Sequence, residues 1–566
     1  MKRDDLRLET LRADILIVGG GAAGCYAAIS AARINPDLRI LVLEKANVKR
    51  SGCLAGGVNA INAYIVEGHT EHEYLEYVRW DAEKIIRDDL VLSMAKRFNE
   101  TTRDLERMGL VILKDESGNY VSRGKRNIKI NGENIKPILA SELERYDNIC
   151  VINHVNVTDL LVDENGVCGA VGFSVNFEAA FVIAARATLV ATGGAAGLYR
   201  PNNPGFSRHK MWYPPFNTGA GYAMGARIGA EMTSFEMRFV AQRCKDTIAP
   251  TGTIALGVGA PEVNVLGETY AFRYGHSTSR RAQGATAEAL AGRGPCYLKT
   301  VGLSSEQEAE LCRAYLNMSP AQTLKWFESG QTPSRCNVEI EGTEPYIVGG
   351  HTGSGYWIDT SRRTTLAGLY AAGDVAGGAP KKFVTGAMAE GAIAVETMID
   401  DLASRSEIQS EDLARVAREK TDEYLRRMTV HDSVYNVFDL EEAMQKTMDV
   451  YAGGISAKYR YNDNQLEIAQ TRVAELTQMA AALSARDMDE MLRIYELIDR
   501  LTVCETVIAH LKARRETRWP GFGVNANYPE KNNEWEFFVN SRRRDGLVEI
   551  VTRPLTLGKD WYEHTN

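Results

Sequence analysis

Two apolar runs near the N-terminus predict neighbouring strands of a parallel sheet. Residues 14–18 (DILIV) form the first run and end directly at the glycines of GGGAAG, and residues 38–45 (LRILVLEK) contain the second. The alanine-rich stretch between them predicts a helix. Short apolar runs bounded by glycine are typical of strands that are buried on both faces. Strand, glycine turn, helix and strand within about 30 residues make one βαβ unit.

The rest of the chain divides into segments with different patterns. Residues 187–194 (ATLVATGG) and 364–400 repeat the strand-and-glycine pattern, the second followed by a helix. The stretch between them from 233 to 345 is irregular and rich in Gly, Thr and Pro, with two helical stretches. Long amphipathic helices are predicted over 409–515, and the last fifty residues are aromatic and loop-like. We therefore expect one α/β sheet domain that is interrupted by an insertion and followed by helices.

Composition and charge exclude several classes of protein. The 566 residues include 66 basic and 74 acidic side chains, which gives a net charge of −8. A net-negative chain without a lysine–arginine block is a poor candidate for nucleic-acid binding. The nine cysteines lack the short spacings of a metal or iron–sulfur site, so we expect no metal. The N-terminus shows no signal-peptide core, and no run of 18 apolar residues occurs, so we expect no transmembrane segment and a cytoplasmic location.

The first motif that carries chemistry follows the first strand. Gly19, Gly21 and Gly24 have the G-x-G-x-x-G spacing, and Glu44 ends the next strand twenty residues later. Such glycines allow a tight turn and bring the backbone close to a pyrophosphate at the helix N-terminus, while the acid accepts from a ribose hydroxyl. Glycine turns without a ligand also exist. Here both the flanking strands and the acid at the end of the second strand match the dinucleotide-binding pattern, so the motif predicts dinucleotide binding.

A second turn of similar character lies far along the chain. Gly373 and Asp374 follow a strand in the segment AAGD, and a helix is predicted to open near Gly386. An acid at a strand end beside a helix N-terminus suits the hydroxyl groups and ring edge of a flavin, although an ordinary αβ turn would also explain it. Two turns that can each bind a phosphate, separated by an insertion, favour FAD over NAD as the cofactor.

These motifs resemble the flavoprotein superfamily of succinate dehydrogenase and fumarate reductase. Members with covalent flavin carry a histidine in the segment SHT, where this chain has Arg50-Ser51-Gly52, so the resemblance implies non-covalent FAD. Longer sequence blocks narrow the resemblance from the superfamily to one family. These blocks are KRSGCLAGGVNAINAY, NGENIKPILA, FEMRFVAQRCKD, GGHTGSGYWID, GLYAAGDVAGGAPKKF and RWPGF. In these blocks the chain resembles the α-subunit family of dissimilatory adenylylsulfate reductases.

The resemblance implies an α/β fold with five parts. These are a Rossmann-like FAD-binding domain in two pieces (1–232 and 346–405), an inserted α+β capping domain (233–345), a C-terminal helical domain (406–515) and an extended tail for partner contact (516–566). The family reduces adenosine 5′-phosphosulfate to AMP and sulfite, or runs the reverse reaction, through a flavin N5–sulfite adduct. Its electrons come from a ferredoxin-like β subunit that holds the iron–sulfur clusters, which fits the scattered cysteines of this chain.

The resemblance also assigns roles to residues within the matching blocks. Arg243 and His351 are expected to face the sulfite or sulfate group, and Trp212 to wall the catalytic pocket above the flavin ring. The expected substrate contacts are Leu256, Arg293 and Phe383 in the AMP site, and Asn62 and Glu133 near the nucleotide or the flavin. Arginine suits such a site because its planar guanidinium can donate two parallel hydrogen bonds to two oxygens of a phosphate or sulfite. The expected FAD contacts are Gly19, Gly21, Ala22, Ala23, Gly24, Glu44, Lys45, Ser51, Gly52, Gly56, Gly57, Asn59, Thr192, Gly193, Gly194, Gly373, Asp374 and Glu390.

Other interpretations of these residues stay open at this point. His351 could bond turn amides, Trp212 and Phe383 could be core residues, and Arg243 could form a surface ion pair. Arg293 next to Gly294-Pro295 could stabilise a turn, and the tail could fold on its own body. Alternative functions are a divergent fumarate-reductase-like enzyme for another small anion, and an electron-transfer subunit without a substrate site.

Overall fold

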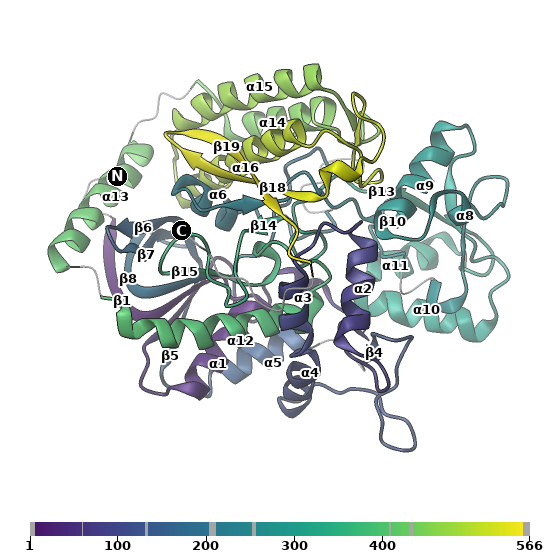
Figure 1. Cartoon of the computed structure of the whole chain (residues 1–566), viewed down its shortest axis with the longest axis horizontal. Helices are drawn as coiled ribbons and strands as arrows, with labels where there is room; N and C mark the ends of the chain where they lie inside the picture. Colours follow the sequence, from purple (N-terminus) through teal and green to yellow (C-terminus); the bar gives the residue numbers. More distant parts are fainter. Residues whose placement is uncertain are drawn as a thin grey trace.

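The computed structural model describes residues 6–58, 60–130, 134–202, 211–251, 256–406, 409–429 and 434–557. Its centre is a seven-stranded sheet with the order β5-β2-β1-β8-β7-β6, in which β15 also pairs with β8 (Figure 1). Strands β5, β2, β1, β8 and β15 run parallel, and β7 and β6 form an antiparallel extension. The strands are β1 (Arg7–Val18), β2 (Ile40–Glu44), β5 (Ile149–Asn153), β6 (Val155–Asp163), β7 (Gly166–Ser174), β8 (Ala179–Val190) and β15 (Leu369–Ala371).

Strand β1 is longer than the apolar run that predicted it. The run covered 14–18, whereas the strand starts at Arg7 and pairs with β8 from Ala179 onward. Its first half is largely exposed and polar (RLETLR), so it lacks the continuous hydrophobic signal of a buried strand. The pairing with β8 defines this half of the strand.

Helices α1 (Ala22–Ile34) and α12 (Phe383–Asp401) pack against each other beside the sheet (Figure 1). Small residues make this contact close. A methyl group built on Gly391 would lie 2.4 Å from the carbonyl oxygen of Ala23. The two helices follow the two glycine turns, so their packing brings both turns to the same end of the sheet.

The inserted segment forms its own unit, drawn in teal at the right of Figure 1. Its four-stranded sheet has the order β10-β13-β12-β11, and a separate apolar core that includes Leu298, Leu311 and Tyr315 fills the unit. The elements are β10 (Gln242–Cys244), β11 (Glu262–Val263), α8 (Ala271–Tyr274), α9 (Thr278–Leu290), β12 (Cys296–Leu298), α10 (Ser305–Met318), α11 (Pro320–Ser329) and β13 (Val338–Gly342).

Four helices follow the second part of the central sheet: α13 (Ser410–Thr429), α14 (Val437–Tyr451), α15 (Asp463–Ala481) and α16 (Met488–Ala513). Helix α16 is the most deeply buried of them, and α14, α15 and α16 pack on one another (Figure 1). None of the helices in the described ranges combines the length and apolar character that a bilayer crossing requires.

The tail is not loop-like, which corrects the prediction from sequence. Strands β18 (Phe537–Arg544) and β19 (Leu547–Pro554) form a hairpin, and β18 pairs with β9 (Met232–Thr233), which pairs with β14 (Gly355–Tyr356). Asp545 and Gly546 adopt φ values of 50° and 80° at the turn. Asp-Gly between strand-forming residues is a strong hairpin signal, so this hairpin has a local determinant in the sequence.

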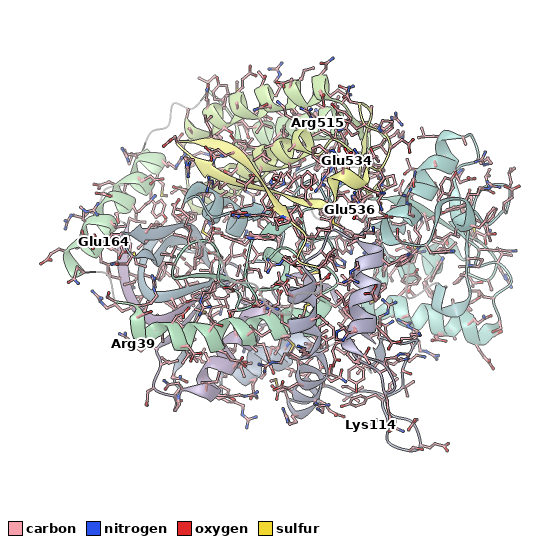
Figure 2. The ribbon with its side chains drawn as sticks, viewed as in Figure 1. Arg39, Lys114, Glu164, Arg515, Glu534 and Glu536 are labelled. Atoms are coloured by element: carbon pink, nitrogen blue, oxygen red, sulfur yellow. The ribbon has the colours of Figure 1, made fainter. Side chains whose placement is uncertain are left out.

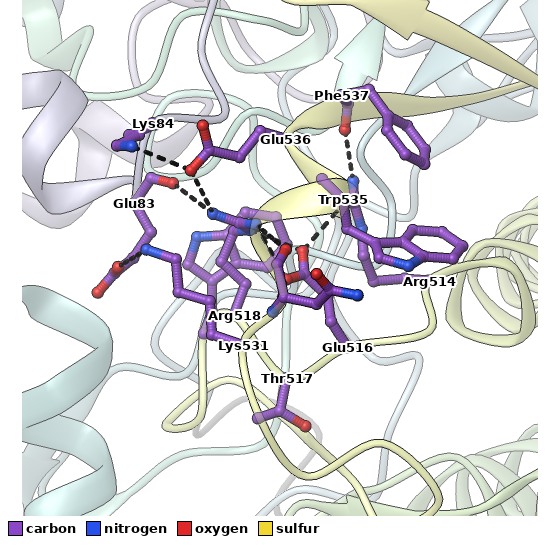
Figure 3. Close-up of polar contacts among 12 residues, drawn as sticks. Glu83, Lys84, Arg514, Glu516, Thr517, Arg518, Lys531, Trp535, Glu536 and Phe537 are labelled. Carbon is purple, nitrogen blue, oxygen red and sulfur yellow. Dashed lines mark hydrogen bonds and ion pairs between the residues drawn. The ribbon is translucent and has the colours of Figure 1, made fainter.

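A network of buried charges fixes the start of the tail to the body (Figure 3). Glu516 pairs with Arg518 at 2.6 Å and with Arg514 at 3.4 Å, and all three side chains are almost fully buried. Arg518 also donates to the carbonyl oxygen of Glu83 at 3.1 Å. Trp519 Nε1 donates to the carbonyl oxygen of Ala82 at 3.0 Å, so the tail holds the turn that ends α2.

The remaining elements connect these units, and charged side chains such as Arg39, Lys114 and Glu164 lie at the periphery (Figure 2). They are η2 (Cys53–Gly56), β3 (Ala60–Ile61), α2 (Glu71–Asp81), α3 (Asp88–Ala95), α4 (Phe98–Arg107), β4 (Ile128–Lys129), α5 (Ile135–Leu143), α6 (Ala220–Arg227), η3 (Leu256–Val258), η4 (Gly373–Val375), η5 (Leu402–Ser404), β16 (Arg460–Tyr461), β17 (Val524–Asn525) and η6 (Asn533–Trp535).

Candidate functional site

The first glycine turn has the geometry of a dinucleotide-binding loop. Gly19 has φ 104°, and a methyl group on Gly24 would lie 1.9 Å from the carbonyl oxygen of Gly19, so only glycine fits at both positions. At Gly21 the nearest neighbour of such a methyl group is 3.9 Å away. The backbone of Gly21 is therefore open to a ligand at the N-terminus of α1, whose helix begins with Ala22 and Ala23.

Glu44 lies at the end of β2, directly beside this turn. Its two carboxylate oxygens accept hydrogen bonds of 2.8 Å from the backbone nitrogens of Gly20 and Ala46. Each oxygen keeps a second lone pair, so the carboxylate can also accept from a ribose hydroxyl. The next residue, Lys45, points elsewhere and pairs with Glu496 at 2.9 Å.

Lys136 of α5 is a buried cation under the glycine turn. Its Nζ donates to the carbonyl oxygen of Gly20 and lies 3.4 Å from Cys25 Sγ, and the residue is fully buried. The lysine thus stabilises the turn from below. It lies in the block NGENIKPILA, where a single lysine precedes an apolar run, but no role was predicted for it.

Replacing Lys136 by methionine is expected to lower the affinity for FAD by about tenfold or more. The change leaves the Gly20 carbonyl without its charged donor and removes a positive charge beside the turn. Fluorescence titration of the deflavinated protein with FAD measures the effect, with exposed Lys96→Met as the control. Equal affinities of wild type and Lys136→Met would contradict this role.

The second turn is built on a buried ion pair. Glu390 Oε2 accepts from the backbone nitrogen of Gly373 at 2.9 Å and pairs with Lys382 Nζ, also at 2.9 Å. Lys382 donates to the carbonyl oxygen of Gly373 at 2.8 Å. Glu390 and Lys382 are fully buried, so they fix Gly373, whose φ is 77°. Glu390 Oε1 has no hydrogen-bond partner.

Tyr213 connects the second turn with the glycines after β8. Its hydroxyl donates to Asp374 Oδ2 at 2.8 Å and accepts from the backbone nitrogen of Gly194 at 2.9 Å. Burial raises the pKa of Asp374, and the Tyr213 hydrogen bond opposes this rise. Gly193 has φ 76°, so Gly193, Gly194 and Asp374 form one fixed corner.

The segment 51–57 supplies an open backbone near this corner. Gly52 and Gly57 have φ values of 78° and 89°, and a methyl group on Gly56 would meet nothing within 4 Å. The pKa of the neighbouring Cys53 is raised, with the negative charge of Asp374 adding to the rise and the positive charge of Arg243 opposing it. Segment 51–57, Asp374 and Arg243 therefore act on one another electrostatically.

Two buried hydroxyl groups test whether this space fits a flavin. Ser51 Oγ and Thr192 Oγ1 are buried without a hydrogen-bond partner. Thr192 Oγ1 packs against Gly221 of α6, so the indication of a ligand rests on Ser51. Buried polar atoms in proteins are almost always paired, and the unpaired Ser51 hydroxyl therefore indicates a polar ligand. Together with the open Gly21 and Gly56, the residues fit FAD.

Aromatic rings enclose His351 at the other side of the site. The His351 ring stacks on Phe239, with centroids 4.6 Å apart and planes at 15°. Trp212 and Phe383 contact it edge-on, at 5.0 and 6.0 Å. The structure thus brings the predicted His351, Trp212 and Phe383 together, and Phe239 is a member that the sequence did not reveal.

His351 is a neutral side chain in this environment. Burial lowers its pKa to about 3, and the positive charges of Lys381 and Arg243 lower it further. The unfolded value of 6.5 is higher, so the unfolded chain binds the extra proton between pH 6.5 and 3. This residue's contribution to stability is therefore complete above pH 6.5 and falls as the pH drops toward 3.

A neutral His351 predicts the pH dependence of activity. The activity of a His351→Gln variant is expected to fall about tenfold to a hundredfold, by the same factor at every pH between about 5.5 and 8.5. Measurement of kcat/KM over this range checks it. An inflection near pH 6.5 that occurs in the wild type and disappears in the variant would show that His351 titrates there.

Arg243 of β10 projects from the inserted unit toward the same rings. Its guanidinium carbon lies 5.0 Å from the centre of the Trp212 ring. Burial lowers its pKa to about 10, so it is still charged at neutral pH. Its Nε is buried without a hydrogen-bond partner, and none of the described carboxylates forms an ion pair with it. Its Nη1 donates to the backbone carbonyl oxygen of Gln242 at 3.3 Å. A half-buried guanidinium without a carboxylate partner favours an anionic ligand.

Lys381 joins this site to the inserted unit. It pairs with Asp81 at 2.7 Å and donates to Thr278 Oγ1 at 3.0 Å, at the start of α9. Lys381 and Phe383 have φ values of 62° and 51°, which non-glycine residues rarely adopt. This strained segment holds the Phe383 ring against His351.

The other predicted substrate residues lie on several different elements. Asn62 follows β3, and its Oδ1 is buried without a partner. Arg293 forms two hydrogen bonds to Glu288, at 2.7 and 2.8 Å, and its described contacts stay within the inserted unit. Leu256 begins η3, but its side chain lies outside the described set, as do Asn59 and Glu133 altogether.

Two glycine turns at one end of a parallel sheet, with the unpaired buried Ser51 hydroxyl between them, define a flavoprotein. The family of the FAD binding domain matches residues 14–387. The solved structure of adenylylsulfate reductase from Archaeoglobus fulgidus superimposes with a TM-score of 0.93 at 32% identity, covering 100% of this chain and 99% of that chain.

Two further proteins support the same relationship. The structure of adenosine-5-phosphosulfate reductase in complex with sulfite, as a covalent adduct, matches with a TM-score of 0.92 at 32% identity and covers 100% and 99% of the two chains. Adenylylsulfate reductase subunit alpha from Megalodesulfovibrio gigas is 29% identical over an alignment 619 positions long, which covers 94% of this chain and 93% of its own. The chain belongs to the FAD-binding flavoproteins and, within them, to the family of adenylylsulfate reductase α subunits.

Proposed function

We propose that this chain reduces adenosine 5′-phosphosulfate to AMP and sulfite, or catalyses the reverse reaction. Its family makes it an FAD-dependent oxidoreductase. The observation that carries the substrate proposal is Arg243, a half-buried cation without a described carboxylate partner, beside Trp212 and the neutral His351. Sulfite and phosphosulfate are small oxyanions of the kind that an unpaired guanidinium binds.

Arg243 and the side chains around it have different roles in substrate binding. The Arg243 fork holds oxygens of the sulfur group and stabilises the negative charge that develops there. Trp212, Phe239 and Phe383 exclude water from the same space, which strengthens that electrostatic interaction. His351 is neutral and can donate one hydrogen bond without adding charge.

FAD, when bound, supplies the two-electron redox chemistry. The chain holds it with the turn at Gly19–Gly24, with Glu44 for the ribose, and with Gly373 and Asp374 at the second turn. Ser51 stands where covalent members of the superfamily have histidine, so we propose non-covalent attachment. The Ser51 hydroxyl is free to hydrogen-bond to the cofactor.

Reduction of the substrate through FAD requires an electron donor. We propose a ferredoxin-like iron–sulfur β subunit as the donor, in a complex located in the cytoplasm. The tail, which presents the hairpin β18–β19 at the surface, is the proposed contact.

The test is activity of the purified complex with reduced methyl viologen as the electron donor. Adenylylsulfate should yield AMP and sulfite in equal amounts, and millimolar sulfite should bleach the flavin absorbance. Reduction of fumarate or another unsaturated acid without any response to AMP would overturn the proposal in favour of a fumarate-reductase-like activity. An intact holoprotein that neither bleaches with sulfite nor binds AMP would also overturn it.

A further inference from the structure

A second arginine with an unused guanidinium lies on a hairpin across from Asn62. Residues 110–130 form an extended segment whose end, β4, pairs with β3: Ile61 faces Ile128 and Ala60 faces Lys129. Asn62 is the next residue after β3. The backbone nitrogen of Arg123 donates to the carbonyl oxygen of Asn127 at 2.9 Å, which closes the hairpin turn beside Asn62. Lys114, labelled in Figure 2, belongs to the same protruding segment.

The side chain of Arg123 crosses from this hairpin to the inserted unit. A methyl group built on Gly257 would lie 3.4 Å from Nη1 and 3.9 Å from Cδ of Arg123. Gly257 is the middle residue of η3 (Leu256–Val258). The guanidinium therefore lies over η3, between the strand that leads into Asn62 and the helix that begins with Leu256.

Nothing described neutralises this guanidinium. Its Nε and Nη2 are buried without a hydrogen-bond partner, and none of the described carboxylates forms an ion pair with it. Glu310 is the acidic group whose charge acts on it, but the Glu310 side chain is 52% exposed and its ion pair is with Lys129, at 3.6 Å. Burial lowers the pKa of Arg123. A half-buried arginine with two buried, unpaired nitrogens favours an anionic acceptor.

Arg293 cannot supply the cation at this place in its present geometry. Its Nε and Nη2 both donate to Glu288, a fully buried carboxylate. Opening that pair would leave Glu288 without two charge-assisted hydrogen bonds. Of the two arginines, Arg123 is the one with free donors beside η3.

We propose that Arg123 binds the phosphate of the nucleotide substrate, at the junction between the hairpin and η3. The proposal rests on the proposed function and adds a specificity-determining residue to it. A planar guanidinium with two adjacent free donors matches two oxygens of a phosphate. Arg123 would thus hold the AMP part of the substrate, while Arg243 holds the sulfur group.

The test compares AMP with adenosine, which has the same base and sugar but no phosphate. Binding of each to the holoprotein of wild type and Arg123→Gln is measured by calorimetry. We expect the Kd for AMP to rise about 10- to 100-fold, the range for a lost hydrogen bond to a charged group, and the Kd for adenosine to change less than twofold. Bleaching by sulfite without AMP should need the same sulfite concentration in both proteins.

Matched variants separate this role from a structural one. Lys125→Gln removes the same charge from an exposed neighbour and should leave AMP binding unchanged. Arg123→Lys keeps the charge without the fork, and it should bind AMP with intermediate affinity. It also provides the measurement if Arg123→Gln does not fold.

Three outcomes would overturn the inference. The first is a wild-type affinity for AMP in a folded Arg123→Gln variant, or in Arg123→Lys where Arg123→Gln does not fold. The second is an equal loss of AMP and adenosine binding, which would indicate a general disturbance of the hairpin. The third is a wild-type holoprotein that binds no AMP, which would overturn the proposed function together with this inference.

Discussion

Replacing Arg243 by alanine is expected to lower the turnover of adenylylsulfate by at least 100-fold. Arg243 is the charged donor nearest the Trp212 and His351 rings, and removal of one donor to a developing negative charge costs about 100-fold or more in rate. The measurement is kcat with reduced methyl viologen as donor, in protein with a verified FAD content.

The control for this variant is Arg313→Ala, an exposed arginine on α10 of the same inserted unit. It should keep full activity. Arg243→Lys should recover only part of the loss, because lysine keeps the charge but lacks the planar fork. Wild-type turnover in Arg243→Ala would show that this chain has no substrate site at Arg243, as expected for a pure electron-transfer subunit.

Replacing Gly24 by alanine is expected to abolish measurable FAD binding. The added methyl group would lie 1.9 Å from the carbonyl oxygen of Gly19, which is a backbone atom and cannot rotate away. The turn must therefore open or α1 must move away from the sheet, at a cost of about 3 kcal/mol or more. We expect the affinity for FAD to fall by more than about 100-fold.

Titration of the deflavinated protein with FAD checks this expectation, and thermal unfolding shows whether the fold survives. The control is Ser30→Ala in the same helix, which should bind FAD normally because it adds no atoms. A Gly24→Ala variant that retains bound FAD would contradict the assigned close contact between α1 and the turn.

Much of the nucleotide-binding part could be predicted from the sequence because its determinants are local. The turn at Gly19–Gly24 is defined by glycine spacing and by the apolar runs on each side, and the structure places it at the sheet end as predicted. The second turn at Gly373 was predicted in the same way. In both cases, a few adjacent residues determine the backbone geometry.

Long-range contacts explain what the sequence did not reveal. Lys136 lies 116 positions from Gly20, and its burial depends on how α5 packs under the turn. The first half of β1 is polar and becomes a strand by pairing with β8. The sequence alone does not distinguish Arg123 from Arg293. In the structure, the Arg293 guanidinium donates to Glu288, whereas two nitrogens of Arg123 have no hydrogen-bond partner.

The contact between the tail and the turn after α2 couples two distant parts of the chain. The turn at Glu83 and Lys84 has φ values of 53° and 77°, and Arg518 holds it from 435 positions further along the chain. This turn directly follows Asp81, the partner of Lys381. The segment that carries Phe383 therefore rests indirectly on a charge network in the tail. A change in the tail can reach the substrate site without touching it.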